Sequence, residues 1–150
     1  MKSNFLSGVK QLTEAGAELL TGGDTADGAG YRCQNTLLKV SGAEFLKNAE
    51  GLQAEAFGNE SLLVIADDVK QMVEIAAALE GNLTGCLYTE TSGKDDAAYD
   101  QIAPVLRQKV GRLLNDKMPT GVAVVPSMNH GGPYPRLAIP DSPQSASPPR

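Results

Sequence analysis

Hydrophobic side chains recur every three or four positions near the start of the chain, which is the spacing of one face of a helix. The pattern predicts a helix over residues 4–20, and the glycine pair at 22–23 would end it in a left-handed backbone conformation. Ser41 and Glu44 then form a capping box, which predicts a short helical turn over residues 43–47. The apolar face of the first helix would consist of Phe5, Val9, Leu12, Gly16 and Leu19.

The second half of the chain carries two more helical patterns. An aspartate at 67 or 68 can cap a helix over residues 69–79, which Gly81 would stop. Another apolar stripe predicts a helix over residues 95–109, and Pro104 inside it would kink it. The inward residues would be Val69, Met72, Val73, Ala76 and Leu79 in the former helix, and Ala98, Ile102, Val105 and Leu106 in the latter.

Short apolar segments between these helices are typical of strands. Residues 62–65 are four consecutive apolar positions, and this pattern favours a strand that is buried on both faces. Residues 36–40, 83–89 and 110–115 predict three more strands. Because strands and helices alternate with short connections, we expect an α/β fold with three layers, in which helices cover both faces of a mostly parallel sheet.

The length of 150 residues suits about one domain with a true core, and we assign residues 1–135 to it. Residues 136–150 are rich in proline and serine and lack a strand pattern, so we expect this tail to be disordered. A linker, a weak ligand for a proline-binding domain, and the product of a truncated or frameshifted gene remain open as explanations of the tail.

Charge and composition exclude several classes of function. A net charge of −5 and a sequence pI near 4.8, without a cluster of Lys and Arg, disfavour a nucleic-acid partner. Two cysteines and one histidine cannot supply a four-ligand zinc site, and no apolar run is long enough to cross a bilayer, so we expect neither a metal site nor a membrane partner. The lack of a charged and then apolar leader predicts a cytoplasmic protein.

The first candidate for chemistry is the turn that precedes residues 62–65. Glu55 and Phe57 flank Ala56 and are followed by Gly58, so a carboxylate and an aromatic ring lie together at the entrance of a strand. Both side chains can also be purely structural, because a loop glutamate is commonly solvated and a loop phenylalanine commonly packs into its own core.

A second candidate is the segment 115–135, which follows the end of a predicted strand and is long and rich in glycine and proline. Ligands of open α/β sheets bind beyond the carboxyl ends of strands, and long loops of this kind are often functional. His130 precedes a glycine pair that permits close approach of the backbone to a ligand. It can equally be a turn residue that is hydrogen-bonded within its own loop.

Several motifs in order along the chain resemble one enzyme family. They are the Glu-Ala-Phe-Gly loop at 55–58, the segment LEGNLTG at 79–85, the predicted strand GRLLN, and PTGV at 119–122 followed by HGGPYP at 130–135. Together they resemble the C-terminal part of the catalytic domain of the NAD(P)-dependent aldehyde dehydrogenase superfamily. The PTGV and HGGPYP pair further resembles the branch that oxidises 2-oxoglutarate semialdehyde (2,5-dioxopentanoate).

The resemblance implies roles for individual residues. Glu55 would accept hydrogen bonds from the hydroxyls of the nicotinamide ribose, and Phe57 would pack beside the nicotinamide ring of NAD or NADP. Asn115, His130 and Tyr134 would lie near the pocket for a small aldehyde. In the intact enzyme the partners would therefore be a nicotinamide cofactor and an aldehyde.

The resemblance also shows what the sequence lacks. The family uses a cysteine nucleophile, a glutamate base and an N-terminal cofactor-binding domain, and none is identifiable here. Cys33 and Cys86 lie outside the sequence context of the nucleophile, so we interpret both as structural and assign no catalytic residue. We therefore expect part of an aldehyde dehydrogenase that is inactive alone and self-associates. The alternative is a non-catalytic α/β interaction module or remnant.

Overall fold

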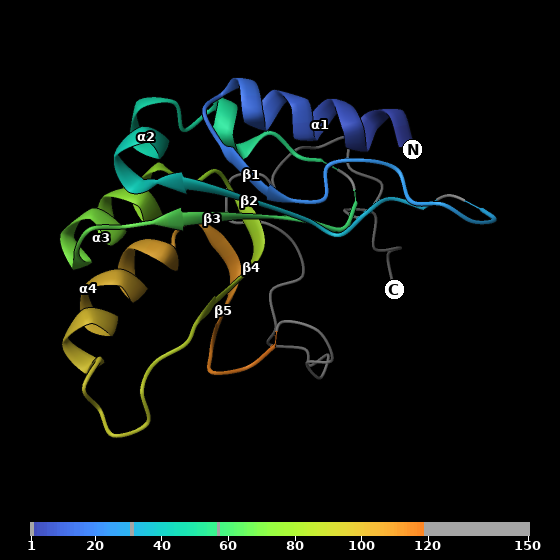
Figure 1. The fold of residues 1–150 in the computed structure, drawn as a ribbon. Helices are drawn as coiled ribbons and strands as arrows, with labels where there is room; N and C mark the ends of the chain where they lie inside the picture. Colours follow the sequence, from blue (N-terminus) through green and yellow to red (C-terminus); the bar gives the residue numbers. More distant parts are fainter. Residues whose placement is uncertain (1, 31, 57, 119–150) are drawn as a thin grey trace, which may run out of the picture. The chain divides into compact units, whose positions relative to one another are not determined.

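The structure is a computed structural model that describes residues 2–30, 32–56 and 58–118. These residues belong to two compact units, and the chain passes from the first to the second between Leu79 and Glu80. Each unit combines helices with parallel strands, which confirms the α/β fold class (Figure 1). No helix within the described residues is both long and apolar enough to span a membrane.

A three-stranded sheet forms the centre of the first unit, in the order β1 (Glu18–Thr21), β2 (Thr36–Ser41), β3 (Glu60–Ile65). β2 and β3 are parallel, as expected, whereas β1 is antiparallel to β2. Glu18 lies opposite Lys39 across that antiparallel pair, and their side chains form an ion pair of 3.2 Å. The helical segments of the unit are α1 (Lys2–Glu14), α2 (Gly42–Lys47), the 3-10 turn η1 (Gly51–Gln53) and α3 (Val69–Ala78).

Helix α1 ends earlier than the hydrophobic pattern predicts. Gly16 has a φ of 115°, and the amides of Gly16 and Ala17 donate to the carbonyls of Thr13 and Leu12 at 3.1 and 3.0 Å. This is the Schellman arrangement that closes a helix with a left-handed glycine. The prediction of a helix over 4–20 is therefore wrong beyond residue 14, because a glycine assigned to the apolar face ends the helix.

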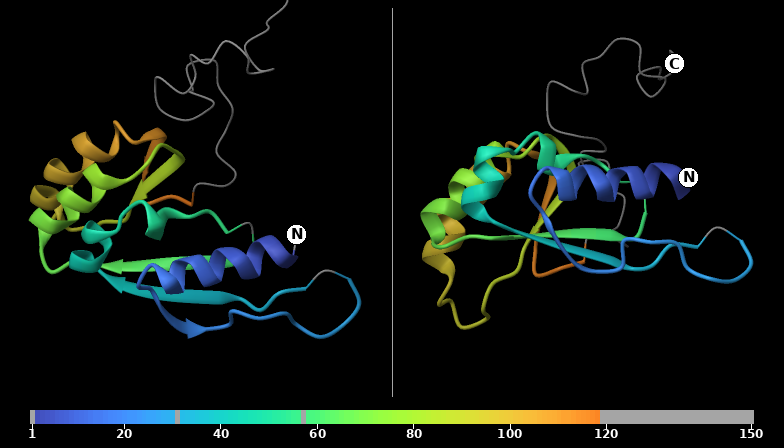
Figure 2. Two further views of the ribbon diagram at one scale, coloured as in Figure 1. Left: turned by 90° about the horizontal axis from the view of Figure 1, so that it is seen from above. Right: turned by 45° about the horizontal axis from the view of Figure 1, so that its top comes forward.

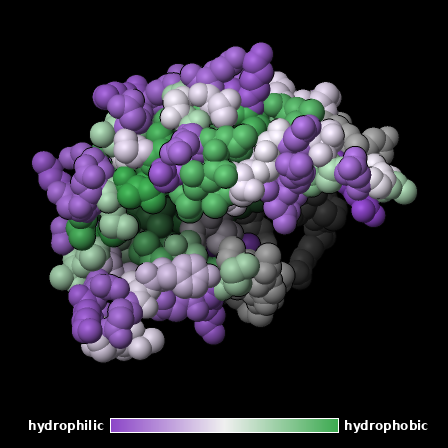
Figure 3. All heavy atoms as spheres, in the orientation of Figure 1, coloured by the Kyte–Doolittle hydropathy of each residue, from purple (hydrophilic) through white to green (hydrophobic). Residues whose placement is uncertain are grey.

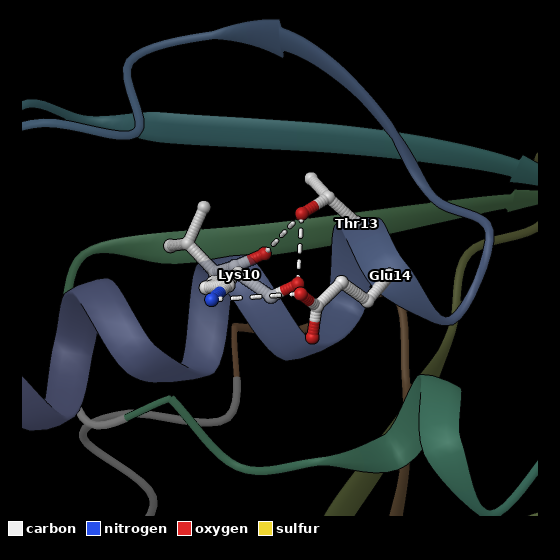
Figure 4. Close-up of polar contacts among 4 residues, drawn as sticks. Lys10, Thr13 and Glu14 are labelled. Atoms are coloured by element: carbon white, nitrogen blue, oxygen red, sulfur yellow. Dashed lines mark hydrogen bonds and ion pairs between the residues drawn. The ribbon is translucent and has the colours of Figure 1, made fainter.

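The remaining face of α1 agrees with its pattern. Phe5, Val9 and Leu12 are 1%, 4% and 1% exposed. On the outer side, Lys10 Nζ and Glu14 Oε1 form an ion pair of 3.6 Å, and the Thr13 hydroxyl donates to the Lys10 carbonyl at 2.8 Å (Figure 4). Both views in Figure 2 place α1 along the sheet of the first unit.

The core of the first unit lies between its helices and one face of its sheet. Leu38 and Val40 of β2 are 0% and 4% exposed, and side chains from α1, α2 and η1 pack against them. Half-buried residues of α3 join from the same side, among them Ile75 and Ala78. The cluster of buried residues is Leu12, Ala17, Leu38, Val40, Phe45 and Leu52.

Side-chain caps begin two of these helices where the sequence predicts them. The Ser41 hydroxyl accepts a hydrogen bond from the Glu44 amide at 3.2 Å and starts α2. The Asp68 carboxylate accepts one from the Gln71 amide at 2.7 Å and starts α3. Both caps satisfy amide groups that have no partner within the helix, so these predictions are confirmed.

Strand β3 does not match the prediction of burial on both faces. Its side chains alternate between half-buried and exposed, and Leu63 and Ile65 are 43% and 52% exposed. Figure 3 shows hydrophobic surface, in green, over the strands of the first unit. The apolar run thus reflects strand preference as much as burial, and this prediction is wrong for one face.

The second unit contains β4 (Asn82–Leu87), α4 (Asp96–Leu106) and β5 (Val110–Asn115), with β4 and β5 parallel. Ile102 and Leu106 of α4 are each 8% exposed, which confirms the predicted inward face. The predicted helix over 95–109 ends three residues early in hydrogen-bonded turns.

Candidate functional site

The Glu55 loop is the segment of residues 54–59 between η1 and β3. The Glu55 side chain is exposed, and no hydrogen bond or ion pair joins it to any other residue in the described ranges 2–30, 32–56 and 58–118. Its carboxylate is thus open to a ligand that carries hydroxyl groups. Phe57, the second residue predicted in this loop, lies outside the described residues.

Polar side chains hold both ends of the Glu55 loop. Before it, the Gln53 amide nitrogen donates to the carbonyls of Ala49 and Ala78 at 2.9 and 3.2 Å. After it, the Asn59 side chain donates to the carbonyl of Cys33 at 3.1 Å and to Asn35 Oδ1 at 2.7 Å. The loop is therefore tied to the body of the first unit at each end.

Helix α1 meets the middle of the Glu55 loop at two glycines. A Cβ atom at Gly8 would lie 2.3 Å from Ala56 Cβ, and one at Gly58 would lie 2.3 Å from Cδ2 of Phe5. Real Cβ atoms do not approach other heavy atoms so closely. The helix and the loop therefore touch at a distance that only glycine permits at these positions.

Glu60, the first residue of β3, carries a second carboxylate near this loop. Its Oε2 atom is buried and has no hydrogen-bond partner among the described residues. Burial disfavours the charged form and raises the pKa of the Glu60 carboxyl above its ordinary value. Glu60 lies in register with Thr36 of β2, at the end of the sheet where the Glu55 loop enters it.

The carboxyl ends of β4 and β5 form the second candidate region. Asn115 ends β5 and is exposed. The next residue, Asp116, has a φ of 52°, and its amide donates to the Leu87 carbonyl at 2.9 Å. Its carboxylate accepts from the Thr89 amide at 2.8 Å and from the Thr89 hydroxyl at 3.2 Å. Asp116 thus joins the two strand ends where the predicted pocket residue Asn115 lies.

A thiol and a phenol lie close to this junction. The Cys86 thiol donates to the Lys117 carbonyl at 3.0 Å and is not part of a disulfide. Desolvation, the neighbouring Cys86 thiol and the charge of Asp116 raise the pKa of the Tyr88 hydroxyl. His130 and Tyr134, the other predicted pocket residues, lie outside the described residues, so the structure brings together only the strand ends that lead to them.

Two known proteins that are similar to this chain share one activity. It is 38% identical over 119 residues to alpha-ketoglutaric semialdehyde dehydrogenase 2 of Azospirillum brasilense, a match that covers 75% of this chain and 22% of the relative. It is 32% identical over 104 residues to the alpha-ketoglutaric semialdehyde dehydrogenase of Acinetobacter baylyi, which covers 69% of this chain and 19% of that relative. The chain belongs to the aldehyde dehydrogenase superfamily. The same relatives support the 2-oxoglutarate semialdehyde branch, since α-ketoglutaric semialdehyde is the same compound.

Solved aldehyde dehydrogenases share the fold of this chain. A 1-pyrroline-5-carboxylate dehydrogenase from Thermus with bound NAD matches with a TM-score of 0.64 and 23% identity, over 87% of this chain and 23% of that one. An aldehyde dehydrogenase from Bacillus cereus matches with a TM-score of 0.61 and 18% identity, over 87% of this chain and 24% of that one. No protein-family model matches the chain. This aldehyde dehydrogenase chain spans about a fifth of the length of its curated relatives.

Sequence reasoning missed three residues that shape the candidate regions of this aldehyde dehydrogenase chain. Gly8 was the most visible, because glycine is a poor helix former and stands inside an apolar helix pattern. Glu60 begins an apolar strand, where a carboxylate is uncommon. Asp116 is harder to recognise from the sequence, because its only distinguishing feature is its position directly after the end of a predicted strand.

Proposed function

We propose that this chain is part of an NAD(P)-dependent aldehyde dehydrogenase that oxidises 2-oxoglutarate semialdehyde to the carboxylic acid. Within that enzyme it supplies the loop beside the nicotinamide and part of the wall of the aldehyde pocket. The identity of 38% to the Azospirillum brasilense enzyme is the observation that carries the proposal. The free Glu55 carboxylate on an anchored loop supports it from the structure.

The chemistry of Glu55 fits the sugar of a nicotinamide cofactor. An ionised carboxylate only accepts hydrogen bonds, and its two oxygens can serve two adjacent ribose hydroxyls. Glu55 is exposed and has no competing partner among the described residues, so no existing contact has to break first. When bound, the cofactor supplies the hydride acceptor. Glu55 holds the ribose, and we assign to Phe57 the packing against the nicotinamide ring.

The aldehyde side of the proposed site begins at the ends of β4 and β5. Asp116 accepts two hydrogen bonds from Thr89 and so fixes the direction in which the chain leaves Asn115. We propose that Asn115, together with His130 and Tyr134 of the following segment, lines the pocket for the aldehyde. The support for the last two is their sequence context in the PTGV and HGGPYP motifs.

The cysteine nucleophile and the general base of the reaction must come from outside this chain. We therefore expect the purified 150-residue chain to reduce neither NAD nor NADP when an aldehyde is added. We also propose that it self-associates, because apolar side chains such as Leu63 and Ile65 are exposed on a sheet face.

The test replaces Glu55 in a full-length enzyme. The matching segment of the Azospirillum brasilense relative is exchanged for this chain, and Glu55→Gln is compared with the unsubstituted chimera. Hydrogen bonds to a charged group contribute about 1.5 to 3 kcal/mol, so the dissociation constant of NAD or NADP should rise roughly ten- to hundredfold. Calorimetry measures that constant. The free energy of unfolding, measured by thermal denaturation, should stay within about 0.5 kcal/mol of that of the parent chimera.

Glu50→Gln is the matched control, because Glu50 is also an exposed carboxylate, five positions earlier and outside the loop. It should leave the cofactor affinity unchanged. Equal cofactor affinity in the Glu55→Gln chimera and this control would make Glu55 a solvated loop residue and remove the cofactor role.

A further inference from the structure

We propose that helix α1 sets the position of the Glu55 loop, with Gly8 and Phe5 as its positioning residues. The inference rests on the proposed cofactor role of Glu55. Neither residue would touch the cofactor. Each acts through the backbone of the loop, Gly8 at Ala56 and Phe5 at Gly58.

Gly8 shows that the approach of helix and loop is close. Glycine is disfavoured inside a helix, yet Gly8 stands in the middle of α1 and is buried. An added Cβ would lie 2.3 Å from Ala56 Cβ and 2.8 Å from Ala56 Cα, so part of the conflict is with the loop backbone itself. A side chain at position 8 therefore cannot be accommodated by a rotamer change alone.

Phe5 provides the second contact, one turn of helix earlier. Its ring is 1% exposed and lies against Gly58, where an added Cβ would be 2.3 Å from Cδ2 and 2.9 Å from Cε2. The contacts at Ala56 and Gly58 lie one and three residues after Glu55. Together, these two contacts limit how far the backbone at Glu55 can move toward α1.

Helix α1 is itself a firm support. Val9 and Leu12 are 4% and 1% exposed, and the Schellman arrangement at Gly16 fixes the end of the helix. Since Gln53 and Asn59 hold the loop ends, a shift of the loop middle has to occur between these anchors. The position of the carboxylate therefore depends on the side chains that α1 presents.

The first arm of the test uses the 150-residue chain and nuclear magnetic resonance. In the wild-type chain, the Ala56 methyl group should show an Overhauser contact to the Gly8 backbone protons. Gly8→Ala should shift the resonances of residues 54–59, whereas Ser7→Ala, at an exposed position of the same helix, should leave them in place. Phe5→Leu opens the second contact without adding an atom and should also shift them.

The second arm measures cofactor affinity by calorimetry in the full-length chimera described above. Gly8→Ala should weaken NAD or NADP binding by about tenfold, since small displacements of a positioning group have effects of this size or larger. Ala56→Gly in the Gly8→Ala background should restore part of the affinity, because it removes the 2.3 Å contact and leaves the one at 2.8 Å. Ser7→Ala should bind as the parent does.

Three outcomes overturn the inference. One is unchanged resonances at residues 54–59 in both Gly8→Ala and Phe5→Leu. Another is a shifted loop with cofactor affinity equal to that of Ser7→Ala. The third is a loss of affinity that Ala56→Gly does not reduce. Failure of the proposed function gives a different result, because Glu55→Gln would then leave the affinity unchanged while Gly8→Ala still shifted the loop resonances in the first arm.

Discussion

Asp116 offers a substitution series in which side-chain bonding and backbone strain can be separated. Its carboxylate accepts two hydrogen bonds from Thr89. Its φ of 52° lies in the left-handed region, which glycine adopts freely, Asn and Asp adopt at some cost, and other residues avoid. Asp116→Ala loses both bonds and keeps a Cβ in the left-handed conformation. Asp116→Gly loses the same bonds but has no Cβ, and Asp116→Asn keeps one acceptor oxygen.

The expected losses follow from these contacts. The bonds lie at an exposed strand end where water can replace them, so we estimate about 1 to 2 kcal/mol for removing both, which is less than the sum of two bonds to a charged group. The left-handed conformation adds about 1 kcal/mol for alanine relative to glycine. Asp116→Ala should thus cost about 2 to 3 kcal/mol, Asp116→Gly about 1 kcal/mol less, and Asp116→Asn the least.

Urea unfolding followed by circular dichroism measures these differences, and amide exchange of β4 and β5 locates them in the second unit. Lys117→Ala is the control, because the exposed Lys117 side chain is next to Asp116 in the sequence and forms no hydrogen bond with Thr89. Equal stabilities of the alanine and glycine variants would refute the strain argument. An alanine variant as stable as the parent would refute the contribution of the Thr89 bonds.

Two further predictions concern stability in the first unit. Burial raises the Glu60 pKa, so the folded state binds the proton more tightly than the unfolded state, and stability should fall as the pH rises from about 4.3 through the raised value. Glu60→Gln should remove this dependence of stability on pH and should be more stable than the parent at pH 7. Melting temperatures of both proteins from pH 4 to 8 test this prediction. The same pH dependence in the variant and the parent would contradict it. Asp68→Ala should cost about 1 kcal/mol by removing the bond to the Gln71 amide, while Asp68→Ser keeps an acceptor and should lose less. Thermal unfolding distinguishes the two variants. An alanine variant as stable as the serine variant would contradict the stabilising role of the cap.

Predictions from the sequence succeeded where the cause is local. The caps at Ser41 and Asp68 depend on residues three positions apart, and both form as expected. Strand β5 covers residues 110–115, as its apolar run predicts. The loop position of Glu55 was also predictable, because it depends only on the residues on either side.

The failures involve partners that are distant in the sequence. Leu19 continues the spacing of the helix face, but it lies in β1 and pairs with Leu38 across a long loop. A strand of four residues is too short to show a period of its own, so the helical pattern was extended over it. Likewise, the contact of Gly8 with Ala56 joins segments 48 positions apart, and no local pattern reveals it.

The division of the described chain between Leu79 and Glu80 has a consequence for biosynthesis. Among the described residues, the three strands of the first sheet and the helices of the first unit all lie before residue 80. Because domains generally fold as units and in order of synthesis, this part can form its core while β4 and β5 are still inside the ribosome. A ribosome-bound chain stalled some forty residues after position 79 should already protect Leu38 and Phe45, and the Glu55 loop would then be in place before the aldehyde side exists.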